Sequence, residues 1–198
     1  MRLRVVILLT GSLLAGACQS RSDSSGPPAA PQAPPAAPTP PPGTPQPKLL
    51  HAAAARHLFS SRTAPDQFRL ELRGDSLLTG AVRLSIVAAS GDTLLKEQFP
   101  AQALLDYGLL RYGPTPTYAQ REAYVRERID QFFADKQFRD PAIGPQEQFV
   151  ARQSDRAIWG EVKQTGLPGF FYTLYEEDGR GLAYSPRQRR AVVFRRCC

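Results

Sequence analysis

The spacing of apolar and polar residues predicts three β-strands in the middle of the chain. Phe68, Leu70 and Leu72 alternate with charged residues, which is the period of a half-buried strand. The same alternation continues over residues 82–88, Ser90-Gly91-Asp92 supplies turn residues, and residues 93–99 can return beside the preceding strand. These segments predict a first antiparallel meander.

The apolar period changes to that of a helix after the Gly-Pro-Thr-Pro break at residues 113–116. Thr117 can cap the first turn with its hydroxyl, while Gln120 can reach back to the cap amide. The apolar residues at helical spacing are Tyr118, Val125, Ile129, Phe132 and Phe133. A long helix is therefore predicted from residue 117 until it ends before Pro141.

Shorter elements are predicted on both sides of this helix. Residues 101–107 and 155–163 fit short helices, and the Ala-rich stretch 49–59 fits a helix at the periphery. Residues 170–175, 182–184 and 191–195 fit strands separated by turn residues, which makes a second meander. The pattern predicts an α+β fold: an antiparallel sheet built from two meanders, with one long and one or two short helices on one face.

The amino terminus has the pattern of a secretory leader. Arg2 and Arg4 precede an apolar run that ends in the small residues Ala15-Gly16-Ala17, directly before Cys18. The apolar run is too short for a membrane-spanning helix, so residues 1–17 are predicted to be a signal peptide.

This leader and its cysteine resemble the precursor of a bacterial lipoprotein. The resemblance implies that Cys18 becomes the new amino terminus and carries the acyl chains, palmitate among them, that hold the protein on a membrane of the cell envelope. Gln19, rather than Asp, follows the cysteine, which favours the outer membrane over the inner membrane. Ala15-Gly16-Ala17 also fits an ordinary signal-peptidase site, which would release a soluble periplasmic protein that begins at the same cysteine.

A proline-rich segment separates the leader from the rest of the chain. Residues 26–48 contain eleven prolines and almost no charge, a composition that favours extended polyproline II over a folded core. At about 3.1 Å per residue, the stretch from Pro27 to Pro47 can span roughly 65 Å. Residues 18–48 are thus predicted to be a disordered tether, and residues 49–198 a single globular domain.

The domain shows no common catalytic motif, so no catalytic residue, cofactor or metal site is predicted. The only two histidines, His51 and His57, lie beside the tether and are expected at the surface. A carboxylate-dependent enzyme acting on cell-wall or other envelope polymers is the alternative function. The carboxylates available for it are Asp106, Glu122, Glu147 and Glu161.

Two neighbouring cysteines end the sequence. Cys197 and Cys198 can form a vicinal disulfide, bridge two molecules, or remain a reduced pair able to bind a soft metal ion. A minor disulfide or variable thiols at the end of the last strand is the favoured interpretation. If Cys18 is not acylated, a bridge from the tether to the carboxyl terminus becomes feasible.

The net charge and the location of the basic residues admit two interpretations, an anionic partner or a basic surface without one, and the second is favoured. The formal charge is +7, and removal of the leader leaves +5. The last twelve residues contain Arg187, Arg189, Arg190, Arg195 and Arg196, which predict an anionic-surface binding site. Codon composition and protection of a strand edge explain the same arginines without a partner.

These features predict a non-catalytic binding or assembly-accessory domain that a lipid holds on a membrane. Its partner would be an anionic envelope lipid or polymer, or another envelope protein. Aromatic residues such as Tyr172 and Tyr175 are further contact candidates if they are exposed, although packing in the core or on the sheet surface is the favoured interpretation. Nucleic acid is not expected as a partner, because the leader predicts export.

Overall fold

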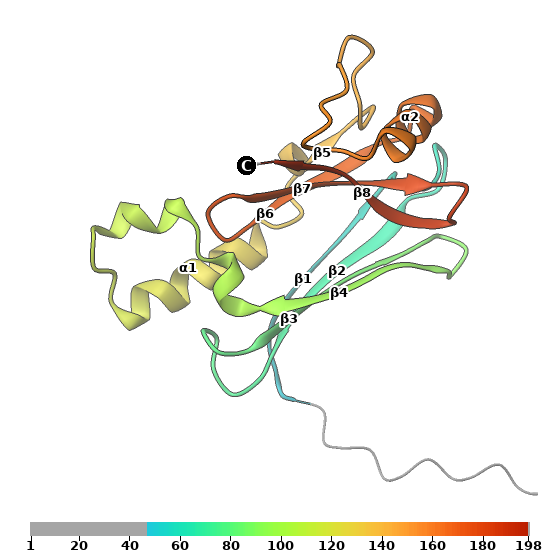
Figure 1. The fold of residues 1–198 in the computed structure, drawn as a ribbon. Helices are drawn as coiled ribbons and strands as arrows, with labels where there is room; N and C mark the ends of the chain where they lie inside the picture. Colours follow the sequence, from blue (N-terminus) through green and yellow to red (C-terminus); the bar gives the residue numbers. More distant parts are fainter. Residues whose placement is uncertain (1–46, 198) are drawn as a thin grey trace, which may run out of the picture. The chain divides into compact units, whose positions relative to one another are not determined.

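The computed structural model describes residues 47–197, and its strands form two antiparallel sheets (Figure 1). The first sheet contains, in this order, β1 (Leu49–His57), β2 (Asp66–Arg73), β3 (Ala81–Val87) and β4 (Thr93–Pro100). The second contains, in this order, β5 (Phe138–Arg139), β6 (Gly169–Leu174), β7 (Asp178–Ser185) and β8 (Arg190–Cys197). The predicted α+β class and its two meanders are confirmed. The predicted leader and most of the predicted tether lie outside the described residues.

Both longer predicted helices are present, but the first ends at Asp130 rather than just before Pro141, because residues 138–139 instead pair as a strand with Phe170 and Gly169 of the second sheet. The α-helices are α1 (Tyr118–Asp130) and α2 (Arg156–Thr165), and the short 3-10 helices are η1 (Ala101–Leu104), η2 (Tyr107–Tyr112) and η3 (Asp135–Gln137). The predicted cap of α1 is confirmed: the Thr117 hydroxyl accepts from the Gln120 amide at 3.3 Å, and the Thr117 amide donates to the Gln120 side chain at 2.8 Å. Asp155 caps α2 by accepting two backbone amides.

The prediction of a peripheral helix over residues 49–59 is wrong, because residues 49–57 form β1. Alanine favours helices in isolation, but here β2 offers a free edge, and β1 pairs along it with Ala53 opposite Leu70 and Ala55 opposite Phe68. Both histidines are half-buried rather than fully exposed. His51 contacts Asp130 of α1 at 2.7 Å, and His57 stacks on Phe138 at 3.6 Å between ring centroids.

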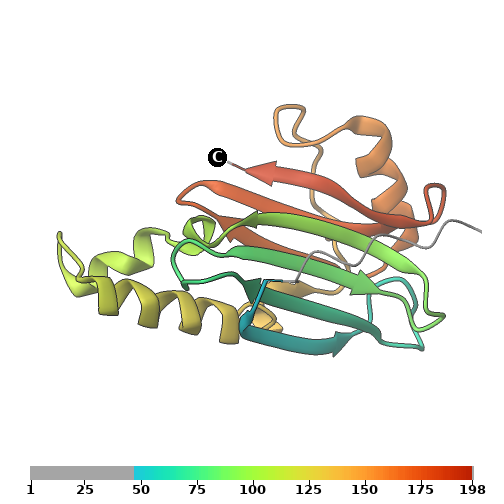
Figure 2. The ribbon, with the colours of Figure 1, turned by 90° about the horizontal axis from the view of Figure 1, so that it is seen from below.

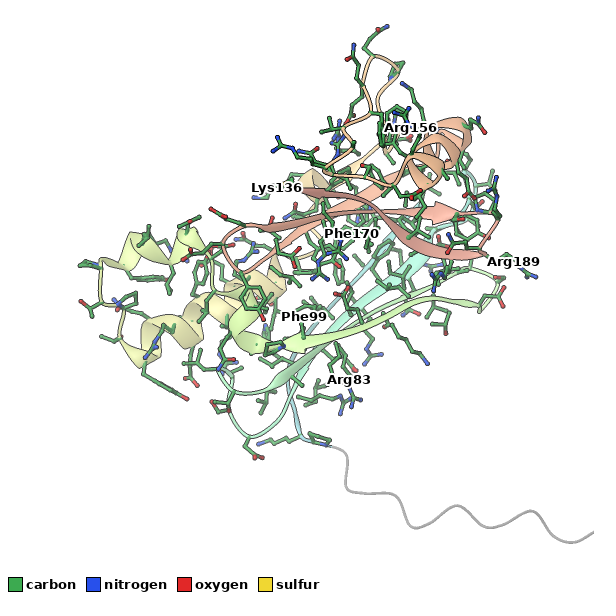
Figure 3. The ribbon with its side chains drawn as sticks, in the orientation of Figure 1. Arg83, Phe99, Lys136, Arg156, Phe170 and Arg189 are labelled. Atoms are coloured by element: carbon green, nitrogen blue, oxygen red, sulfur yellow. The ribbon has the colours of Figure 1, made fainter. Side chains whose placement is uncertain are left out.

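The two meanders do not share one sheet, and their inner faces pack against each other. Figure 3 shows Phe99 and Phe170 in the space between the sheets. Phe68 of β2 meets Phe170 of β6 with 5.4 Å between ring centroids, and both side chains are fully buried. The buried inner residues of the first sheet include Phe68, Leu70, Leu72, Val82, Leu84 and Ile86, and those of the second sheet include Phe170, Tyr172, Leu174 and Leu182.

The helices lie on different sides of the second sheet, rather than on one face of a single sheet as expected. Val125 and Ile129 of α1 are buried in the core between the sheets, whereas Tyr118, predicted to point inward, is 53% exposed. Val162 of α2 instead belongs to a separate cluster on the outer face of the second sheet, where it packs near Phe194. The outer face of the first sheet has no such cover (Figure 2).

A buried carboxylate joins two turns of the first sheet. Asp66, at the start of β2, is fully buried. It accepts hydrogen bonds from the backbone amide of Ser60 at 2.6 Å, from the Ser60 hydroxyl at 3.0 Å and from the amide of Ala89 at 3.1 Å. One side chain thus holds the β1–β2 connection and the β3–β4 hairpin together.

Replacement of Asp66 by Ala is expected to lower the free energy of unfolding by about 2–4 kcal/mol, because three donors lose their acceptor in a buried site. Urea denaturation measures this change. The matched control is Asp92→Ala in the β3–β4 turn, where an exposed carboxylate accepts from Ser90. A loss for Asp66→Ala no larger than that of the control would contradict the assignment.

Candidate functional site

The structure divides the five predicted arginines between the two ends of β8. Arg187, Arg189 and Arg190 are exposed around the β7–β8 turn, which we call the arginine turn (residues 186–190). Arg195 and Arg196 lie near the other end of the strand. At about 3.3 Å per residue, five residues of strand separate Arg190 from Arg195 by roughly 17 Å. The five arginines therefore do not form one patch.

Arg195 and Arg196 are engaged with carboxylates. Arg195 forms an ion pair with Glu147, which Arg139 also contacts at 3.2 Å. Arg196 lies 3.7 Å from Asp178, and its side chain is 59% exposed. The structure thus gives Arg195 an internal role in attaching the loop before α2 to β8.

The arginine turn is held in place by a carboxylate of α2. One oxygen of Glu161 accepts from the Ser185 hydroxyl at 2.7 Å and from the Arg187 amide at 3.0 Å, and Ser185 in turn accepts from the Gln188 amide at 3.0 Å. Ser185 is fully buried. The hydrogen bond from Ser185, then that from the Arg187 amide, lowers the pKa of Glu161, so the carboxylate stays charged. The backbone beneath the three arginines is therefore fixed, while their side chains extend into solvent.

Arg189 adopts a backbone conformation that arginine seldom takes. Its φ of 53° lies in the left-handed region, where residues with a Cβ atom are disfavoured and glycine is the usual choice. Figure 3 shows Arg189 at the edge of the domain beside this turn. Three guanidinium groups on one turn can bind phosphate or carboxylate groups through paired N–H donors.

The arginine turn borders a shallow hollow of about 270 Å³. Its lining comes from the β1–β2 connection, the β3–β4 hairpin and the second sheet, namely Ser60, Ala88, Ser90, Asp92, Thr93, Leu94, Tyr184 and Arg189. The Ser60 and Ser90 hydroxyls donate to Asp66 and Asp92, so the hydrogen-bond donors of this hollow are the Arg189 guanidinium and the hydroxyls of Thr93 and Tyr184. The arrangement suits an anionic or strongly polar group at the surface.

The two predicted aromatic contacts have different environments. Tyr175, in the β6–β7 turn, is 48% exposed, with a left-handed φ of 56°. Tyr172 is buried and belongs to a polar cluster that sequence reasoning missed: its hydroxyl donates to Glu97 of β4 at 2.6 Å, and Arg180 of β7 also pairs with Glu97. Burial and the neighbouring Glu97 raise the pKa of Tyr172. An inward-facing glutamate in β4 was the signal for this cluster.

The carboxylates considered for catalysis are engaged at separate places. Asp106 accepts from Tyr124 and pairs with Arg128 at 3.0 Å; burial and then this hydrogen bond raise the pKa of Tyr124 to about 12. Glu147 pairs with the two arginines described above, and Glu161 supports the arginine turn. Each of these three thus has a structural role where it lies.

The carboxyl end of β8 borders a hollow of about 550 Å³. Val150, Arg152, Gln153, Glu177, Asp178, Arg196 and half-buried Cys197 line it. Its two carboxylates are neighbours in sequence, and Asp178 is paired with Arg180. Cys18 and Cys198 lie outside the described residues, so lipid attachment and the alternatives for Cys197 and Cys198 stay predictions.

Two further features bear on the class of site. No group of three or more His, Cys, Asp or Glu side chains within residues 47–197 is arranged to hold a metal ion. In the same part of the chain, none of the helices has the length and apolar character needed to cross a bilayer.

Replacement of Glu161 by Gln is expected to lower the free energy of unfolding at pH 7 by about 1 kcal/mol, because it weakens two hydrogen bonds that solvent partly screens. The pKa of Glu161 is lowered in the folded chain, so its stabilising effect is present above its ordinary pKa of 4.5 and is lost as the pH falls through the folded-state value. Denaturation at pH 7 and pH 3.5 should therefore show a difference between variant and wild type that shrinks at the lower pH. Glu122→Gln on α1 is the control, and equal effects of the two variants would contradict the role of Glu161.

Comparison with known proteins provides no relative on which to base a function. No protein-family model, curated protein or solved structure matches the chain.

Proposed function

We propose that this protein is an exported, lipid-anchored component of the bacterial envelope, whose domain binds an anionic envelope partner without catalysing a reaction. The leader with Arg2 and Arg4, and the small residues before Cys18, support export and lipid attachment. The observation that carries the binding role is the arginine turn: three exposed arginines on a backbone that Glu161 holds fixed.

The place of the arginine turn in the domain supports a partner distinct from the anchor. The chain enters the domain beside β1, where the Gly74 amide donates to the carbonyl of Lys48 at 2.9 Å. Arg189 shares its hollow with Ser60 and Asp92, which belong to the turns at the opposite end of the first sheet. The length of β1, about 26 Å for nine residues, separates these two ends. The arginine turn therefore lies at the end of the first sheet away from Lys48.

The chemistry of the turn defines the class of partner. Arginine binds phosphate and carboxylate oxygens with paired donors and keeps its charge at any physiological pH. Envelope lipids, polymers and acidic proteins carry such groups. The partner is thus an anionic component of the envelope, with the outer membrane as the favoured location.

Lipid attachment is expected to depend on Cys18. Cells that express the full-length protein and are fed labelled palmitate should yield a labelled protein in the membrane fraction, whereas Cys18→Ser should lose the label and leave that fraction. Cys197→Ser is the matched control and should keep both. An unlabelled wild-type protein, or an unchanged distribution of Cys18→Ser, would refute the lipid anchor.

Binding is expected to depend on the arginine turn. The variant Arg187→Ser, Arg189→Ser, Arg190→Ser should be retained at least fivefold less than wild type on immobilised, detergent-solubilised envelope extract, because rim charges dominate attraction to an anionic partner. Its unfolding temperature should remain close to that of wild type, since the three side chains are exposed.

The control removes the same charge from other surfaces through Arg126→Ser, Arg152→Ser and Arg156→Ser, all at exposed positions. It should be retained like wild type. Equal losses in the two variants would show that net charge alone causes retention and would refute a role for the turn.

A further inference from the structure

The outer face of the first sheet carries a marked excess of basic residues. The strand pairing brings alternate residues of β1, β2, β3 and β4 to this face. The basic residues among them are Arg56, Arg69, Arg73, Arg83 and Lys96, which together we call the basic face. Glu71 is the one acidic residue at the outward positions of these four strands. Protein surfaces that only keep a protein in solution mix charges of both signs, and the basic face differs from them in its excess of positive charge.

The basic face is open. Figure 2 shows the first sheet with no helix in front of it, and Figure 3 places Arg83 on the side of the sheet away from Phe99 and Phe170. Arg56, Arg83 and Lys96 are exposed, and the Arg69 side chain is 52% exposed. Residues with short side chains, Ala52, Ala54 and Ser85, lie between them. Four of the five basic side chains therefore reach solvent, whereas that of Arg73 is only 20% exposed.

Glu71 does not cancel this charge. Its carboxylate lies 2.8 Å from Arg69 and 3.3 Å from Arg73, so two arginines share one negative charge. Partial burial opposes its ionisation, but hydrogen bonds and positive charge from Arg73 and Arg69 outweigh burial and keep its pKa below the ordinary value. Arg56, Arg83 and Lys96 add positive charge without a carboxylate beside them among the described ion pairs.

A hollow of about 410 Å³ lies between two basic side chains of this face. It is lined by Glu71, Arg83, Leu84, Ser85, Lys96, Glu97 and Gln98. Arg83 donates across it to the Gln98 side chain at 3.3 Å, while the carboxylate of Glu97 is engaged with Tyr172 and Arg180 of the second sheet. A phosphate group in this hollow would meet Arg83, Lys96 and the Ser85 hydroxyl, and also Glu71, whose carboxylate is paired with Arg69 and Arg73.

We propose that the basic face lies on the anionic phosphate headgroups of the bilayer that holds the lipid anchor. The charges are spread over four strands, which suits a planar surface of headgroups better than a single polymer strand. The chain enters beside this face, since Arg73 donates to the carbonyl of Pro47 at 3.3 Å. Pro47 would thus lie close to the membrane surface. The direction of docking rests on the proposed function, whereas the affinity of the face for headgroups does not.

The test uses the mature chain with Cys18→Ser, so that no acyl chain contributes to binding. Its partition is measured on vesicles of phosphatidylcholine alone and on vesicles that also contain phosphatidylglycerol. The phosphatidylglycerol vesicles should bind at least tenfold more protein, and added salt should weaken this binding. Adding Arg69→Gln, Arg83→Gln and Lys96→Gln should lower the partition coefficient on the order of 100-fold, at about fivefold per basic residue.

The matched control is the variant Arg126→Ser, Arg152→Ser, Arg156→Ser, because it also removes three exposed positive charges and none of them belongs to the basic face or to the arginine turn. It should stay within threefold of its parent on the same vesicles. Equal losses in the two variants, or binding that does not depend on phosphatidylglycerol, would overturn the proposal. Circular dichroism and the unfolding temperature should confirm that both variants remain folded.

The experiment also separates a membrane from a soluble polyanion. Dextran sulfate should compete for the face only weakly compared with phosphatidylglycerol vesicles at equal charge concentration. Tight binding of dextran sulfate without binding to vesicles would show that the basic face binds a soluble polyanion and would refute its contact with the membrane. Absence of palmitate labelling would refute the lipid anchor but would not change the binding of the Cys18→Ser chain to vesicles. Failure of the proposed function and failure of the proposed membrane contact can therefore be told apart.

Discussion

The packing of Phe68 against aromatic side chains from both sheets is the contact on which the rest of the domain depends. Its ring lies 5.2 Å from that of Phe138, 5.4 Å from Phe170 and 5.5 Å from Phe59, and it is fully buried. Edge-to-face contacts of this kind stabilise a core beyond the area they bury. They also fix which side of each strand faces inward. Because side chains alternate along a strand, a shift by one residue would bring Arg69 into the core and turn Phe68 to solvent.

Once the inner faces are fixed, the outer face of the second sheet is covered and the outer face of the first sheet is open. On the second sheet the outward residues include Phe171, Val192 and Phe194, which must be covered, and α2 covers them with Val162. On the first sheet the outward residues are mostly charged or small, so a helix would have little apolar surface to bury there. The same physical rule thus explains the position of α2 and the open basic face.

Several carboxylates of this domain form hydrogen bonds and ion pairs that connect its elements. Asp66 joins two turns, Glu97 links the two sheets through Tyr172 and Arg180, and Glu161 holds the arginine turn. Because many acidic groups are engaged in this way, the unbalanced charge at the surface is positive. A domain with fixed acids and exposed arginines is suited to contact with anionic surfaces. Both proposed contacts, the arginine turn and the basic face, use this excess.

Features that depend on neighbours along the chain could be predicted from local patterns of residues. The alternation around Phe68, the capping pair Thr117 and Gln120, and the turn before β4 all follow from local periodicity and hydrogen bonding, and the structure confirms them. The leader with Cys18 is local in the same sense and remains a prediction. In contrast, residues 49–57 form a strand because of a contact distant in sequence: pairing with β2 outweighs the helical preference of alanine. The tertiary structure also pairs Glu97 with Tyr172, places Arg190 and Arg195 apart, and brings basic residues of four strands to one face. These arrangements depend on the register of the strands, which no local pattern encodes.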